Sequence, residues 1–217
     1  MSTATELLSQ FGKAVETKNT GEFARIRESI LALELDSPEN VMAHYRLALY
    51  VLHQEKNLNE VMSLLQKICT ANIPCAETTQ ARISYAICLR AKGKLQQAIF
   101  ELRKVFNETQ KNTLVQTMAL DYLATFSREA NAPADTVAKI NDERIAQLTH
   151  LATHSTNKDD KAQATIRLAA ALEERNQKGD TERARTLFTD VAKHSSDIEK
   201  PSRAAAKDAV KRYAQKR

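Results

Sequence analysis

The chain has 217 residues, a length that fits one large domain or one short array of repeats better than two independent units. It contains only 4 glycines, 4 prolines and no tryptophan, which leaves little turn chemistry for a multi-stranded sheet. Helix-favouring residues are abundant instead, so we predict an all-α protein. The net charge of +5 is concentrated at the C-terminus, because residues 200–217 carry seven basic side chains and one acidic side chain while the remainder is nearly balanced.

Five pairs of helices are expected along the chain. The first helices of the pairs are predicted at residues 5–17, 38–54, 77–91, 114–130 and 160–177. Most second helices show a ladder of mainly apolar residues at offsets 0, 3, 7 and 10, the spacing of one helix face. Four such ladders occur: Phe23, Ile26, Ile30, Leu33; Leu58, Val61, Leu65, Ile68; Leu95, Ala98, Leu102, Val105; and Thr181, Ala184, Phe188, Val191. The pattern predicts antiparallel pairs in which each ladder faces the core.

The spacing of the ladders predicts one further unit. Their first residues lie 35, 37 and 86 positions apart, and the last interval is twice 43. The missing second helix is expected at 133–152, where Ala138, Ile145 and Leu148 keep the spacing and Asn141 interrupts it. We therefore predict a single repeat domain, 1–217, with a C-terminal capping helix at 202–216. Its five units are expected at 5–36, 37–74, 76–109, 113–153 and 159–196.

Two segments resemble the tetratricopeptide repeat (TPR), a 34-residue helix pair with a Gly-containing turn and an Ala followed by an aromatic residue in its second helix. They are 93–98, with Gly93 and Ala98, and 179–188, with Gly179, Ala184 and Phe188. The resemblance implies a right-handed α-solenoid whose first helices line a concave groove. Such a groove binds a peptide or helix of another protein, so a non-catalytic adaptor or scaffold is expected.

The resemblance also implies which side chains line the groove. Taken unit by unit, the predicted partner-binding residues are Arg46, Tyr50, His53, Ile83, Ile87, Arg90 and Arg128. Arginine forks recognise carboxylates in bidentate geometry, so a partner with acidic and apolar side chains is expected. The alternative is that these arginines are ordinary solvated residues of helix surfaces.

The basic C-terminal helix has two interpretations. It caps the last repeat through Ala205, Val210 and Tyr213, as a solenoid end requires. Alternatively, its cations contact phosphate or an acidic partner, which would make the chain a nucleic-acid-associated adaptor. The cations concerned are Arg203, Lys207, Lys211 and Arg212. Only one aromatic residue accompanies them, so base stacking is not favoured.

No motif indicates catalysis or a cofactor. Four scattered glycines cannot form a phosphate-binding loop, and His150 and His154, although four residues apart, lack the acidic neighbour and third ligand of a zinc site. We expect no enzyme activity, no metal and no cofactor. Cys69, Cys75 and Cys88 show no C-x-x-C spacing, and no run of about 18 apolar residues occurs, so a cytoplasmic protein without a membrane span is expected. Self-association through the solenoid ends stays open.

Overall fold

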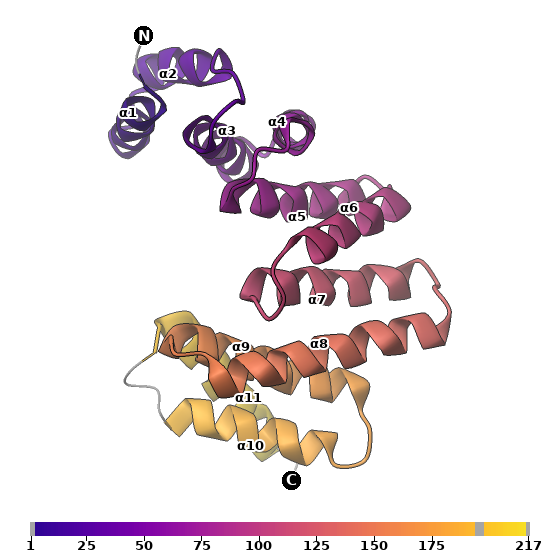
Figure 1. Ribbon diagram of the computed structural model, residues 1–217. Coiled ribbons are helices and arrows are strands. Elements are labelled where there is room, and N and C mark those ends of the chain that lie inside the picture. The colour runs from indigo at the N-terminus through magenta and orange to yellow at the C-terminus, as the bar shows by residue number, and fades with distance from the viewer. Residues whose placement is uncertain (1–2, 194–197, 216–217) are drawn as a thin grey trace. The chain divides into compact units, whose positions relative to one another are not determined.

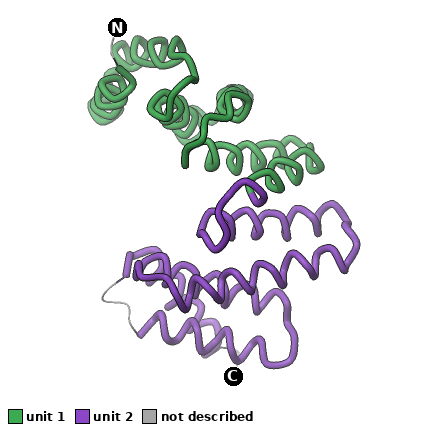
Figure 2. Tube along the Cα trace, in the orientation of Figure 1, with its two compact units in different colours: residues 1–105 green, residues 106–217 purple. Residues whose placement is uncertain are grey.

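The computed structural model describes residues 3–193 and 198–215, and throughout these residues the regular structure is helical. Consecutive helices run back and forth and pack in sequential pairs (Figure 1). The prediction of an all-α repeat fold is therefore confirmed. The chain forms two compact units, residues 1–105 and 106–217 (Figure 2). Whether one repeat domain with the predicted unit boundaries is the right description stays a prediction.

The first unit contains two complete helix pairs, a fifth helix and most of a sixth. Its helices are α1 (Ala4–Glu16), α2 (Thr20–Leu31), α3 (Pro38–Tyr50), α4 (Leu58–Ala71), α5 (Ala76–Ala91) and α6 (Leu95–Glu108). A π-helical segment, Val51–Glu55, continues α3. The prediction of one helix over 38–54 is thus right in extent, but its last turn is widened.

The second unit begins inside the end of α6. It contains α7 (Leu114–Glu129), α8 (Ala134–His154), α9 (Lys158–Arg175), α10 (Asp180–Lys193) and α11 (Lys200–Gln215). Helix α11 packs on both α10 and α9, as expected of a capping helix. It begins two residues before its predicted start because Pro201 fits the first turn, where no amide donor is needed. Positions 194–196 of the predicted fifth unit and position 216 of the predicted cap lie outside the described residues.

The apolar ladders form the cores of the helix pairs. In all four, the residues at offsets 3 and 7 are buried: Ile26, Ile30, Val61, Leu65, Ala98, Leu102, Ala184 and Phe188. In the unit that was predicted from the spacing of the ladders, Ile145 and Leu148 are buried as expected. Ala138 is exposed, so the first half of α8 does not continue the ladder. The register predicted for α11 is also wrong at one position, because Ala205 is exposed whereas Ala206 and Ala209 are buried.

Helix boundaries follow from local hydrogen bonds. The side chain of Thr3 accepts from the backbone N–H of Glu6 in a capping box, and Ser37 caps α3 directly before Pro38. Turns between helices use the left-handed backbone region, mostly without glycine. The residues with φ between 52° and 58° are Lys18, Lys56, Asn72, Asn112, Asn131 and Asn176. Asparagine is the non-glycine residue that tolerates this region best, which explains how so few glycines suffice.

Candidate functional site

A groove in the first unit brings together three of the residues predicted to bind a partner. Arg46 and Tyr50 lie on α3, and His53 lies on the π-helical segment. With residues of α1 they line a cavity of about 540 Å³. The full lining is Leu8, Phe11, Gly12, Met42, Arg46, Leu49, Tyr50, His53 and Gln54. We call this cavity the α1–α3 groove.

The apolar side of the α1–α3 groove is built on three aromatic rings. Phe11 of α1 meets Tyr50 edge-on with ring centroids 5.5 Å apart, and Phe23 of α2 lies 4.5 Å from Tyr50. The Phe11–Phe23 distance is 5.4 Å. Aromatic pairs at these distances favour a particular relative orientation of the rings, in addition to the stabilisation that burial supplies. The cluster therefore joins the first three helices and holds one wall of the groove in place.

The polar side of the α1–α3 groove carries one cation, Arg46. Among the residues that the structure describes, no acidic side chain lines the groove. Arg46 is exposed, and among the residues that the structure describes it has no ion-pair partner. Its guanidinium is therefore available to a carboxylate without the loss of an internal pair. One cationic side chain beside an apolar wall suits an acidic and apolar ligand.

The π-helical segment sets the position of His53 and Gln54 at the end of the groove. Such segments are rare and are frequent at functional sites. Here Glu55 pairs with Arg27 of α2 at 2.8 Å, and Arg27 also pairs with Glu60 of α4. The segment ends at Lys56, whose φ of 56° stops the helix. A lysine at the place of the TPR turn glycine indicated this helix end in advance, whereas no sequence feature indicated the widened turn.

The other residues predicted in the first unit lie outside the α1–α3 groove. Ile83 is buried, so it packs in the interior of the unit and offers no contact surface. Ile87 is 36% exposed and Arg90 is exposed, both on α5. We therefore leave Ile83 out of the proposed site and treat Ile87 and Arg90 as a separate surface.

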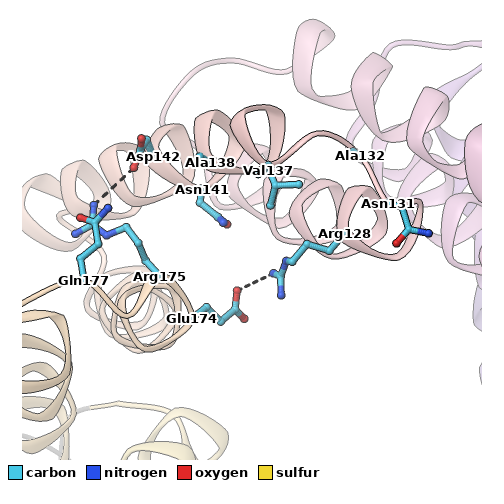
Figure 3. A pocket seen from close by; sticks show the side chains of 11 residues that line it. Arg128, Asn131, Ala132, Val137, Ala138, Asn141, Asp142, Glu174, Arg175 and Gln177 are labelled. Carbon is cyan, nitrogen blue, oxygen red and sulfur yellow. Dashed lines mark hydrogen bonds and ion pairs between the residues drawn. The ribbon is translucent and has the colours of Figure 1, made fainter.

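In the second unit, Arg128 lines a polar cavity of about 630 Å³ (Figure 3). The cavity lies among the end of α7, the exposed first half of α8 and the end of α9. Arg128 forms an ion pair of 2.9 Å with Glu174, and across the cavity Arg175 reaches Asp142 at 3.6 Å. Both arginines thus have internal partners, in contrast to Arg46.

A network of charges around one buried arginine lies beside this cavity and was not predicted. Arg144 is buried, and it pairs with Asp121 at 2.8 Å and with Glu174 at 2.9 Å. Arg167 pairs with the other oxygen of Asp121, so three helices are joined. Burial raises the pKa of Glu174, but the hydrogen bonds and charges of Arg144 and Arg128 outweigh it and hold the pKa below its ordinary value. The network fixes the α7–α9 geometry that shapes the cavity.

Most of the C-terminal cations have internal contacts. Arg203 donates to the backbone oxygen of Ile198 at 2.9 Å, Arg212 lies 3.9 Å from Glu173, and Lys211 lies 4.0 Å from Asp208. Lys207 is exposed. On the buried side, the Tyr213 hydroxyl donates to Glu173 at 2.6 Å, which anchors α11 to α9.

The two histidines of α8 stack on each other. The rings of His150 and His154 are 4.5 Å apart, and both side chains are exposed. Among the residues that the structure describes, no group of three or more His, Cys, Asp or Glu side chains is placed to hold a metal ion. Within the same residues, no helix is both long and apolar enough to cross a membrane.

The architecture is that of TPR-like repeat proteins. A solved structure of nearly identical TPR-like repeats, from a Podosopora anserina protein named as a kinesin light chain, matches with a TM-score of 0.59 at 15% identity. The match covers 90% of this chain and 100% of that one. A single-substitution variant of those repeats matches with a TM-score of 0.61 at 15% identity, over 90% of this chain and 99% of that one. No protein-family model and no curated protein matches the sequence.

Proposed function

We propose that the chain is a non-catalytic protein-interaction module that binds a peptide or helix of a partner protein in the α1–α3 groove. The observation that carries the proposal is the lining of the groove, which combines an aromatic and aliphatic wall with the cationic side chain of Arg46 and, within the described part of the chain, no acidic side chain. The TPR-like fold supports it, because stacked helical repeats generally serve as binding surfaces.

The partner segment is expected to carry a large apolar side chain and a carboxylate a few residues apart. The apolar side chain would pack beside Phe11 and Tyr50, where burial supplies most of the affinity. The carboxylate would pair with Arg46 and so fix the orientation of the segment. This arrangement predicts that charge reversal at Arg46 weakens binding by about tenfold or more, through repulsion and loss of the pair.

The test is capture of partners from native lysate by the purified full-length chain. Wild type is compared with Arg46→Glu and with Arg25→Glu, a control in which an exposed arginine of α2 outside the groove receives the same charge change. A protein that Arg25→Glu retains and Arg46→Glu loses supports the proposal. If all three baits capture the same proteins in the same amounts, the groove assignment is wrong.

The same experiment addresses the nucleic-acid alternative. Bound nucleic acid is quantified beside bound protein, and a Lys207→Glu, Lys211→Glu variant is added. Nucleic acid that is retained by Arg46→Glu and lost by the lysine variant at low salt would favour the C-terminal helix as the binding surface.

A further inference from the structure

The π-helical segment at the end of α3 changes which side chain follows Tyr50 on the same side of the helix. In an α-helix, the residue one turn beyond Tyr50 is Gln54, four positions further on. A π-helical turn closes from residue i to residue i+5, so across Val51–Glu55 the residue one turn beyond Tyr50 is Glu55. The widened turn therefore acts as one inserted residue. We call the two arrangements the α register and the π register.

Contacts with α2 show that Glu55 has taken this place. Phe23 of α2 packs against Tyr50, with ring centroids 4.5 Å apart. Arg27 lies four residues after Phe23, on the same face of α2. Nη1 of Arg27 lies 2.8 Å and 3.1 Å from the two carboxylate oxygens of Glu55. One face of α2 thus contacts both Tyr50 and Glu55, as expected of residues one π-helical turn apart.

The same turn brings Gln54 into the α1–α3 groove. At about 100° per residue, Met42, Arg46 and Leu49 lie within about 60° of one another around α3, and Tyr50 lies about 40° beyond Arg46. A continuous α-helix would place Gln54 about 40° beyond Tyr50, at the position facing α2 that Glu55 occupies in the π register. The inserted residue turns Gln54 back toward Arg46, and Gln54 accordingly lines the groove.

A second carboxylate holds Arg27 in place for its contact with Glu55. Nη2 of Arg27 contacts Oε1 of Glu60, in the first turn of α4. Glu60 is fixed in turn by Asn57, whose Nδ2 donates to Oε2 of Glu60 at 3.1 Å and whose Oδ1 accepts from the Glu60 backbone N–H at 3.3 Å. The guanidinium is therefore anchored on α4 and presents Nη1 to the end of α3.

The side chain that meets Nη1 differs between the two registers. It is the neutral amide of Gln54 in the α register and the carboxylate of Glu55 in the π register, and a charge-assisted hydrogen bond is the stronger of the two. Because π-helical turns are rare, some feature of the surroundings must favour this one. We propose that Arg27 is a positioning residue that selects the π register by pairing with Glu55, and so places the Gln54 amide where it bonds the partner segment. The use of Gln54 in binding rests on the proposed function, whereas the choice of register does not.

The first experiment exchanges the two side chains in the full-length chain. The variant Gln54→Glu, Glu55→Gln keeps composition and net charge, but its carboxylate stands four residues after Tyr50. Arg27 then finds its partner in a continuous α-helix, so we expect the α register. NMR couplings across hydrogen bonds report the result, because the amide of residue 55 pairs with the carbonyl of Val51 in the α register and with that of Tyr50 in the π register. An exchange variant that keeps the π register would overturn the proposal.

A second pair of variants removes the selecting charge. We expect the α register in Arg27→Met and the π register in Arg25→Met, a control at an exposed arginine of the same helix. This comparison also decides if the exchange variant does not fold. Urea unfolding is recorded for each variant, because Arg27 joins α2 to α4. A loss of stability in Arg27→Met without a change of register would mean that Arg27 only stabilises the fold, and would refute its positioning role.

Binding is measured with the protein that wild type captures and Arg46→Glu loses. The exchange variant should bind that protein about tenfold more weakly, the ratio that one hydrogen bond supplies, because position 54 has left the groove. Unchanged binding by a variant in the α register would refute the role of Gln54. If wild type captures no protein that Arg46→Glu loses, the proposed function fails, and the registers of the variants still decide whether Arg27 positions this segment.

Discussion

Arg144→Met and Arg128→Met each remove an arginine that pairs with Glu174, but Arg144 is buried and also pairs with Asp121. Both arginines place a guanidinium nitrogen 2.9 Å from the same oxygen of Glu174, but the Arg144 side chain is 4% exposed and that of Arg128 is 45% exposed. Removing one member of a buried ion pair costs about 3–5 kcal/mol, whereas an exposed pair contributes about 0–1 kcal/mol. After loss of Arg144, Asp121 keeps Arg167 and Glu174 keeps Arg128. We therefore expect about 3 kcal/mol for Arg144→Met and below about 1 kcal/mol for Arg128→Met.

Amide hydrogen exchange of the full-length variants, resolved by peptide, measures this difference. A loss of about 3 kcal/mol speeds exchange by about a hundredfold at amides of the second unit that open only when the unit unfolds. Peptides from α1 to α4 serve as the internal control and should not change. The reasoning is refuted if both variants accelerate exchange in α7–α9 equally, or if Arg144→Met leaves that exchange unchanged.

Three further predictions concern local conformation and titration. Lys56→Gly should stabilise the first unit by about 1 kcal/mol, because a lysine in the left-handed region is strained; an unchanged urea midpoint would contradict this. Burial raises the pKa of the Cys69 thiol to about 12, so iodoacetamide at pH 8 should label Cys75 well before Cys69 in the folded chain, and equal rates would contradict the burial. The hydrogen bond from Arg175 lowers the pKa of Asp180 to about 2 from 3.8, so its stabilisation is complete above pH 3.8 and is lost as the pH falls toward 2. Asp180→Asn should thus be less stable than wild type at neutral pH, with a gap that closes in acid; NMR titration of the carboxyl group checks the pKa directly.

The helix pairs could be predicted from the sequence because their cores depend on local periodicity. Residues at offsets 3 and 7 of a ladder must face the partner helix, whatever the rest of the chain does. The prediction failed where that spacing carried little information. In α11, alanines occupy 204, 205 and 206 in succession, so apolarity alone does not select which one faces α9 and α10. In α8, Asn141 interrupts the ladder where the helix lines a polar cavity.

The α1–α3 groove could be predicted only in part. The resemblance to TPR units placed Arg46, Tyr50 and His53 on one face, and the structure brings them together. The resemblance did not indicate Phe11 or Leu8, because the sequence alone does not specify which residues of α1 pack beside α3. Nor could the Arg144 network be predicted, since it joins residues 121, 144, 167 and 174 and depends on contacts between three helices. Charged residues on amphipathic helices are usually exposed, so the burial of Arg144 follows only from the packing.

The packing of each helix mainly against the next one or two helices has a consequence for biosynthesis. The principal neighbours of a helix are therefore made shortly after the helix itself. The first pairs can therefore bury their ladders while the C-terminal third of the chain is still being made. Translation and folding would then advance together, and apolar faces would stay uncovered only for the time needed to synthesise one more pair.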